Sequence, residues 1–230
     1  MARIAEDLLL LLLDNASAQP GLERRCRERV LAAAALLDLA HACRIRPAVD
    51  SEPVEAGHLV VLSGPNPADP VLEPALQLLL RRPMSPAAAI AKLRRQTPAA
   101  VLAQLERIGQ IRQVRLQGNA FKGVKRTYAW PLVDRTRAAN ARAALMNALF
   151  EEHNPDPATA TIISLLHMVD GLGAVFSLND RGWEWVNSRA ADIASGSWVA
   201  ESEPDLPEVN LAVTAAAIRP ALVASRRKSP

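Results

Sequence analysis

The sequence predicts a mainly α fold: a single helical domain around a buried helix bundle, with one projecting basic β-hairpin. Hydrophobic residues make up 50% of the 230 residues and aromatic residues only 3%, so the apolar content rests mostly on Ala and Leu. Such residues favour helices that pack closely through small side chains. Apolar residues recur at helical spacing along much of the chain, whereas one stretch alternates as paired strands do. We expect one domain over residues 4–224 and a frayed tail over residues 225–230.

Two helices are expected at the N-terminus. Six consecutive leucines, Leu8–Leu13, lie between acidic residues, and a membrane-spanning helix needs about 20 apolar residues. We therefore expect residues 4–14 to form a buried helix, and any membrane contact of the chain to be peripheral. Residues 23–43 form a long second helix. Four arginines in its first turns oppose the helix dipole, which indicates a binding role or an acidic neighbour.

The middle of the chain carries clear helix start and stop signals. Ser85-Pro86 places an N-cap serine before a proline at the first helical position. Thr97-Pro98 repeats the signal, and Gly109 ends the helix that follows. The elements expected here are a strand at 58–63 and helices at 71–81, 85–95 and 97–108.

The C-terminal part is expected to be helical with one exposed turn. The apolar run at 159–169 is expected to be the most buried helix. SLNDRGWEWVNS, residues 177–188, reads as a surface turn whose two tryptophans pack at a rim rather than stack on a ligand. The remaining helices are expected at 135–152 and 211–224.

Charge is distributed unevenly along the chain. The net charge is only +3, yet residues 81–142 carry 14 Lys and Arg against 2 Asp and Glu. The segments before and after are both acidic. Such clustering creates a local positive potential that acts on partners rather than on the fold. It indicates a polyanionic partner, although a basic run can also be a solvated face.

The stretch IRQVRLQGNAFKGVKRTYAW, residues 111–130, combines this charge with aromatic rings. Its two alternating runs predict a β-hairpin, and it holds three of the eight aromatic residues of the chain and no acid. Rings and cations together suit an anionic membrane, because Trp and Tyr favour the headgroup level and each Lys or Arg contributes roughly 1 kcal/mol near an acidic leaflet. The residues expected to contact the membrane are Phe121, Lys122, Lys125, Arg126, Tyr128 and Trp130.

Catalytic signals are weak. The four histidines are scattered, and the sequence has no phosphate-binding loop or nucleophile elbow. Cys26 and Cys43 provide neither a disulfide framework nor a zinc signature, which fits a cytoplasmic location. We expect no enzymatic activity, no cofactor and no metal site.

A winged helix is an alternative, with helices at 85–95 and 97–108 and the hairpin as the wing. The expected recognition helix, however, carries Arg107 as its only cation and Gln104 as its only amide, and a DNA reader concentrates such groups on that helix. Nucleic acid is therefore a less favoured partner. A third alternative is a protein scaffold or homo-oligomer in which the hairpin pairs with the edge of another chain.

An ordered series of segments resembles the Golgi phosphoprotein family, in its bacterial branch. The series is IAEDLLLLLLDNASAQPG, VLAAAALLDLAHACRI, VLAQLERIGQI, KRTYAWPLVD and PDPATATIISLLHMVDGLGAVF. The resemblance implies a mainly helical domain with a projecting hairpin. It also implies a peripheral adaptor that binds phosphatidylinositol 4-phosphate and retains client proteins.

The resemblance further implies where a headgroup would bind. The family positions for one Trp and three Arg fall on Glu23, Ala32, Arg95 and Pro98, so Arg95 alone matches. The hairpin tip, apolar in eukaryotic members, is KGVK here. The residues expected to bind an anionic headgroup are Arg95 and its neighbours Arg94, Arg25 and Arg27.

Overall fold

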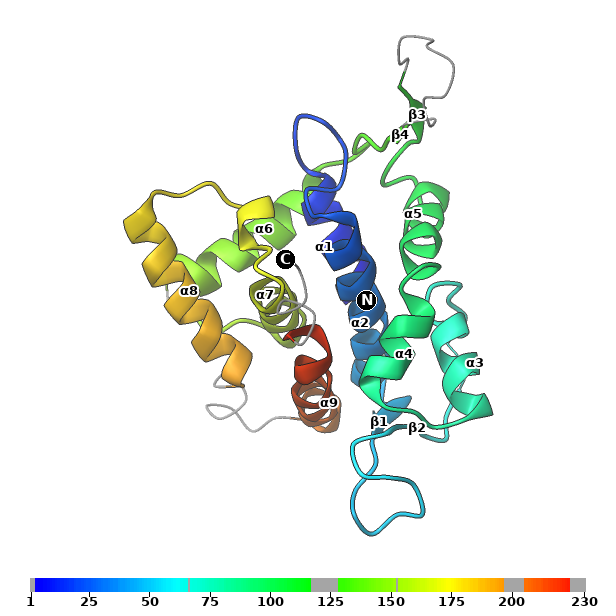
Figure 1. The fold of residues 1–230 in the computed structure, drawn as a ribbon. Helices are drawn as coiled ribbons and strands as arrows, with labels where there is room; N and C mark the ends of the chain where they lie inside the picture. The colour runs from blue at the N-terminus through cyan, green and yellow to red at the C-terminus, as the bar shows by residue number, and fades with distance from the viewer. Residues whose placement is uncertain (1–2, 66, 117–127, 152, 197–204, 224–230) are drawn as a thin grey trace.

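The structure is a computed structural model that describes residues 3–65, 67–116, 128–151, 153–196 and 205–223. Within these residues it is a single, mainly helical domain, as the sequence predicts (Figure 1). The helices are α1 (Ile4–Leu13), α2 (Arg24–His41), α3 (Glu73–Arg81), α4 (Pro86–Leu93), α5 (Thr97–Arg107), α6 (Thr136–Phe150), α7 (Pro157–Met168), α8 (Asp180–Ser195) and α9 (Leu206–Val223), with a 3₁₀ turn, η1 (Leu172–Ala174).

Helices α1 and α2 form the centre of the core. All ten residues of α1 are buried, and so is α2 from Val30 to Ala40. Helices α3, α4 and α5 lie on one side of this pair, and α6, α7 and α8 lie on the other (Figure 1). The buried first helix is therefore confirmed. The prediction that residues 159–169 form the most buried helix is wrong, because α1 is buried throughout while His167 of α7 reaches partly to solvent.

The two central helices are joined by a polar contact as well as by packing. The Asp38 carboxylate near the end of α2 accepts hydrogen bonds from the backbone N–H groups of Ile4 (2.8 Å) and Ala5 (3.0 Å). These are first-turn donors of α1, which have no partner inside their own helix. Asp38 therefore caps α1 from a different helix and fixes the antiparallel arrangement of the pair.

Two short antiparallel ladders occur among the described residues. Strand β3 (Val114–Arg115) pairs with β4 (Tyr128–Ala129), which confirms the base of the predicted hairpin. Strand β2 (Leu59–Val61) lies inside the predicted strand at 58–63. Its partner β1 (Ile45–Pro47) was not predicted, because a three-residue strand that ends in proline shows no alternation.

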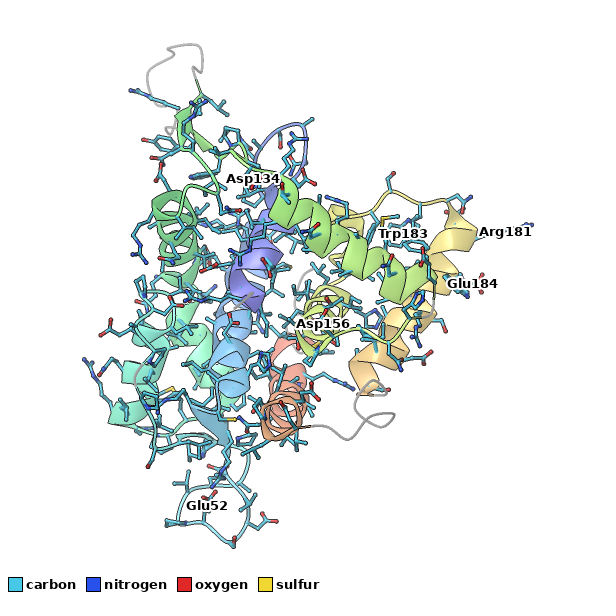
Figure 2. All side chains as sticks on the ribbon, turned by 180° about the vertical axis from the view of Figure 1, so that it is seen from behind. Glu52, Asp134, Asp156, Arg181, Trp183 and Glu184 are labelled. Carbon is cyan, nitrogen blue, oxygen red and sulfur yellow. The ribbon has the colours of Figure 1, made fainter. Side chains whose placement is uncertain are left out.

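Residues 177–188 do not form the expected surface turn. Asn179 is the N-cap of α8, since its side chain accepts the Gly182 N–H at 2.9 Å. The polar residues and the glycine that suggest a turn are the cap and first turn of this helix. As expected, the two tryptophans of this segment pack at the edge of the domain. Trp185 lies 6.3 Å from the ring of Phe150, and Trp183 packs against the core (Figure 2).

Candidate functional site

Three arginines gather where the first turns of α2 meet the end of α4. The Glu28 carboxylate accepts from Arg24 Nε at 2.7 Å and lies 3.7 Å from Arg94 Nη1. Glu28 is nearly buried, with its side chain 11% exposed, whereas that of Arg24 is 77% exposed. One carboxylate is thus shared by two guanidinium groups from helices far apart in the sequence. We call Arg24, Glu28, Arg29 and Arg94 the arginine cluster.

Arg29 belongs to this cluster but has a different contact. Its Nη2 donates to the carbonyl of Ala221 in the last turn of α9. Burial lowers the pKa of Arg29, and the neighbouring charge of Arg94 lowers it further. A cation at the C-terminal end of a helix stabilises the helix dipole, so Arg29 anchors α9 beside the cluster.

The four predicted headgroup residues do not all converge. Arg94 is the C-cap of α4 and joins the cluster. Arg95 follows it in the chain, is exposed, and pairs with no carboxylate among the described residues. Arg25 is exposed on the first turn of α2, and its backbone N–H donates to Glu23. The Arg27 guanidinium donates to the Leu22 carbonyl at 3.1 Å, and burial lowers its pKa.

The structure instead brings Arg24 and Arg29 close to Arg94, and the predicted set contains neither of them. The signal that could have found Arg24 is its i, i+4 spacing to Glu28, which puts both on one helix face. Nothing in the sequence places Arg94 on that face, because the contact depends on how α4 packs against α2.

The structure gives other roles to the residues at the positions where the resemblance places headgroup contacts. The Glu23 carboxylate is the N-cap of α2 and accepts the N–H groups of Arg25 (3.0 Å) and Cys26 (3.2 Å). Ala32 is 0% exposed and is part of the hydrophobic core. Pro98 is in the first turn of α5, where a missing N–H costs nothing.

The base of the hairpin lies at the same end of the molecule as the loop between α1 and α2 (Figure 1). The backbone N–H of Trp130 donates to the Ala18 carbonyl of that loop at 2.7 Å. The Tyr128 and Trp130 rings are 6.4 Å apart and half-buried. The remaining predicted contact residues, Phe121, Lys122, Lys125 and Arg126, lie outside the described residues.

Helix α5 is poorly suited to reading DNA. Its Gln104 side chain is only 6% exposed. The Gln104 Oε1 accepts from Arg107 Nε at 3.0 Å and from Arg107 Nη2 at 2.5 Å. The only amide of the expected recognition helix is thus buried and bonded to the only cation of that helix.

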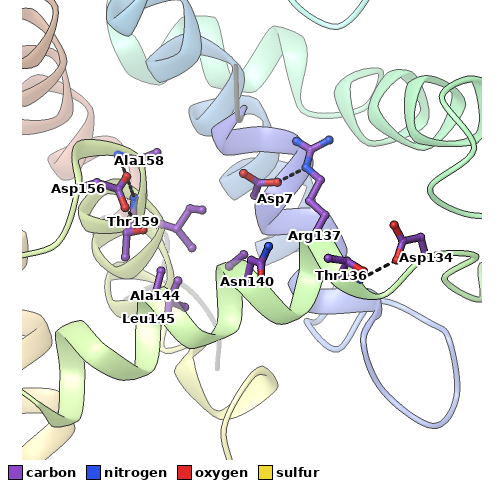
Figure 3. A pocket seen from close by; sticks show the side chains of 12 residues that line it. Asp7, Asp134, Thr136, Arg137, Asn140, Ala144, Leu145, Asp156, Ala158 and Thr159 are labelled. Carbon is purple, nitrogen blue, oxygen red and sulfur yellow. Dashed lines mark hydrogen bonds and ion pairs between the residues drawn. The ribbon is translucent and has the colours of Figure 1, made fainter.

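A pocket of about 430 Å³ lies between α6 and α7 (Figure 3). Its acidic groups serve the fold. Asp7 is paired with Arg137 at 2.6 Å, Asp134 accepts the Thr136 N–H at 2.8 Å, and Asp156 is the N-cap of α7. In the described part of the chain, no group of three His, Cys, Asp or Glu is placed to hold a metal ion.

These features define a class of protein: a helical scaffold with partly exposed arginines on α2 and α4 and with a β-hairpin base at one end. Its family follows from a comparison with family models. The chain belongs to the Golgi phosphoprotein 3 (GPP34) family, whose model matches residues 4–208, and the resemblance is thus confirmed. Proteins of this family are peripheral, non-enzymatic adaptors that bind phosphatidylinositol 4-phosphate. A comparison with curated proteins found no match. The bacterial branch stays a prediction.

Proposed function

We propose that this chain is a cytoplasmic, non-enzymatic peripheral membrane protein that binds anionic, phosphoinositide-like headgroups through the arginine cluster and Arg95. The observation that carries the proposal is the sharing of one carboxylate, Glu28, by Arg24 and Arg94. Counted with Arg29, the cluster holds three cations and one anion, so it retains positive charge. Arg95 adds an exposed cation directly after Arg94.

Guanidinium groups suit a phosphorylated headgroup because their planar fork matches two phosphate oxygens. The N–H groups in the first turn of α2 do not serve this purpose, because Glu23 occupies two of them. Side chains rather than backbone groups therefore provide the donors. Such a site is less shape-selective than a closed pocket, and we expect it to respond to headgroup charge more than to inositol stereochemistry.

The hairpin contributes a second, less specific attraction in this proposal. Lys122, Lys125 and Arg126 add positive charge, while Phe121, Tyr128 and Trp130 favour the headgroup level of the bilayer. The described part of this set, Tyr128 and Trp130, lies where the hairpin leaves the domain. A bound membrane would leave other faces free for a protein client, in keeping with an adaptor.

Vesicle flotation tests the headgroup site with a matched pair of variants. Arg94→Glu with Arg95→Glu should lower binding to anionic vesicles at least about tenfold, since four units of charge change near the bilayer. Arg81→Glu with Arg82→Glu changes the net charge equally at the exposed end of α3 and should cost much less. Equal losses in both variants would mean that net charge, rather than a localised site, drives binding. Absence of wild-type binding at low salt would refute the proposal.

Two further measurements on the purified protein test the alternative functions, nucleic-acid binding and self-assembly. Nucleic-acid binding predicts a gel shift of duplex DNA that weakens steeply with salt; a shift stronger than vesicle binding at equal ionic strength would favour that function. Self-assembly through the hairpin predicts a lower molar mass by light scattering once residues 113–129 are replaced by a short turn. An unchanged mass excludes it.

A further inference from the structure

The outer face of α9 is apolar and exposed along its whole length. Leu206 is 74% exposed, Val209 38%, Val213 53% and Val223 38%. Two further exposed residues, Ala216 and Pro220, complete the row. An apolar residue therefore recurs alternately every three and four positions, which places all six on one helix face.

The opposite face of α9 is buried in the core. It consists of Leu211, Thr214, Ile218 and Leu222, each at most 1% exposed. The helix thus has two opposite apolar faces, whereas Glu208, Asn210 and Arg219 are partly exposed. Its mean hydropathy is 1.2, yet only 28% of it is buried. An apolar helix face normally lies against a core or a membrane. The outer face of α9 is therefore exposed to solvent, although its apolar composition is typical of a buried surface.

By length and composition alone, α9 is long and apolar enough to cross a bilayer. Its contacts favour a different placement. Its inner face packs along α2, and the Asn210 side chain donates to the carbonyls of Ala40 (2.6 Å) and Ile45 (2.8 Å). Crossing a bilayer would require all of these contacts to break, whereas lying on a bilayer would require none to break.

The surroundings of the face indicate what covers it. α9 packs against both α2 and α4, and Arg29 ties its last turn to the arginine cluster through Ala221. The last turn of α9, which also carries Val223 at the end of the exposed row, therefore contacts the arginine cluster. In the sequence, three cations follow α9 with no acid among them: Arg226, Arg227 and Lys228. An apolar strip beside positive charge matches the boundary between acyl chains and anionic headgroups.

We propose that the outer face of α9 lies in the interface of an anionic bilayer, as an apolar contact next to the arginine cluster. This inference rests on the proposed function and adds a component that the headgroup site does not supply. Burial of apolar area does not weaken with ionic strength as charge attraction does. Membrane binding should therefore retain a salt-resistant part that depends on α9.

A fluorescent reporter locates the face directly. Val213→Cys, with Cys26→Ser and Cys43→Ser, is labelled with an environment-sensitive dye and mixed with vesicles of phosphatidylcholine and phosphatidylserine. The label should shift to the blue and be quenched by brominated acyl chains. The matched label at Leu80→Cys, on the 52% exposed Leu80 of α3, should remain in water. A label at residue 213 that stays in water while the protein floats with vesicles overturns this inference and leaves the headgroup site intact.

Charge substitutions supply an independent test. Val209→Asp with Val213→Asp should lower the binding that survives 0.5 M salt about tenfold, because two valine side chains would no longer be buried in the bilayer. Leu80→Asp with Met146→Asp introduces the same charge at exposed apolar positions on α3 and α6 and should retain the salt-resistant part. Equal retention in both variants overturns the inference.

Two other outcomes also count against it. A label at residue 213 that is shielded without vesicles, together with a doubled mass by light scattering, identifies a second copy as the occupant. The same shielding with a monomeric mass shows that another part of the chain covers the face. Absence of any wild-type vesicle binding refutes the headgroup proposal and this inference together.

Discussion

Glu28 controls how much positive charge the arginine cluster presents to solvent. Its carboxylate is nearly buried and is held between Arg24 and Arg94. A buried carboxylate beside two cations stabilises their arrangement, but it also cancels one positive charge. A carboxylate at this position therefore favours the folded arrangement but would weaken the anion binding that we propose for the cluster.

Replacing this carboxylate by an amide should strengthen vesicle binding. Glu28→Gln keeps the side-chain shape and adds one positive charge near the bilayer, so binding to anionic vesicles at low salt should rise roughly fivefold. Asp50→Asn makes the same change at an exposed position between β1 and β2 and should have little effect. The β1–β2 loop lies at the opposite end of the molecule from the loop that leads into α2 (Figure 1). Titration of each variant with vesicles measures the difference, and equal gains would contradict a localised site.

Asp38 links the stability of the α1–α2 pair to pH. Burial raises the pKa of Asp38 from 3.8 to about 7, and the hydrogen bonds from Ala5 and Ile4 only partly oppose this. The folded protein therefore binds a proton more tightly than the unfolded chain does. The resulting stabilisation is complete below about pH 4 and is lost as the pH rises through about 7.

Asp38→Asn should remove this pH dependence. Between pH 4 and 7, the free energy of unfolding of the wild type should fall relative to the variant by on the order of 1 kcal/mol per pH unit. Urea unfolding at several pH values measures it. Asp50→Asn, at an exposed position, serves as the control and should run parallel to the wild type. A constant difference between Asp38→Asn and the wild type would mean that Asp38 is ionised in the folded protein throughout this range.

The structural role of a single residue was predictable where its contacts are with residues nearby in the sequence. The Ser85 cap is confirmed, since its hydroxyl accepts the Ala88 N–H at 3.4 Å. The parallel prediction for Thr97 is wrong, because its hydroxyl donates to the Leu93 carbonyl of the preceding helix. The two motifs look alike in sequence and differ only because the chain before Thr97 is already helical.

Among the elements, α7 depends most visibly on a local start signal. The Asp156 carboxylate accepts the N–H groups of Ala158 (3.0 Å) and Thr159 (3.1 Å) and the Thr159 hydroxyl (2.5 Å). Pro157 then occupies the first turn, where it needs no N–H partner. This arrangement sets the point at which a largely buried helix begins.

Removing the α7 cap should destabilise the domain without changing its fold. Asp156→Ala leaves the first-turn N–H groups without their partner and should lower the free energy of unfolding by about 1 kcal/mol, within a range of roughly 0.5–2. Asp156→Asn keeps an accepting oxygen and should recover most of the loss. Thermal and urea unfolding measure both variants. Equal losses would show that the charge, rather than the hydrogen bonds, matters.

Elements were predictable from sequence where a periodic pattern is long. The helices at α1, α2, α5 and α6 follow apolar spacing and lie within a few residues of their predicted bounds. β1 was missed because it is a strand only through its pairing with β2. α8 was missed because its cap residues also favour turns, and tertiary packing of Trp183 and Val186 decides the outcome.

For the whole molecule, the charge pattern of the sequence points to only part of the arginine cluster. The basic segment supplies Arg94 and Arg95, whereas Arg24 and Arg29 come from a segment whose net charge is negative. Only packing of α4 and α9 on α2 joins them. A linear charge count therefore finds one of the three arginines of the cluster, and the helix arrangement adds the other two.

The same packing predicts that the domain unfolds as one unit. α1 contacts α5 on one side of the molecule and α6 and α7 on the other, and Leu10 at its centre is 0% exposed. Leu10→Ala should lower the free energy of unfolding by about 2–5 kcal/mol. Because both sides depend on α1, amide hydrogen exchange should accelerate together in α5 and in α6 and α7. Leu80→Ala, on the solvent side of α3, should change stability by no more than about 0.5 kcal/mol. Acceleration confined to one side, or two separate unfolding transitions, would show that the two sides are independent units joined at α1 rather than one domain.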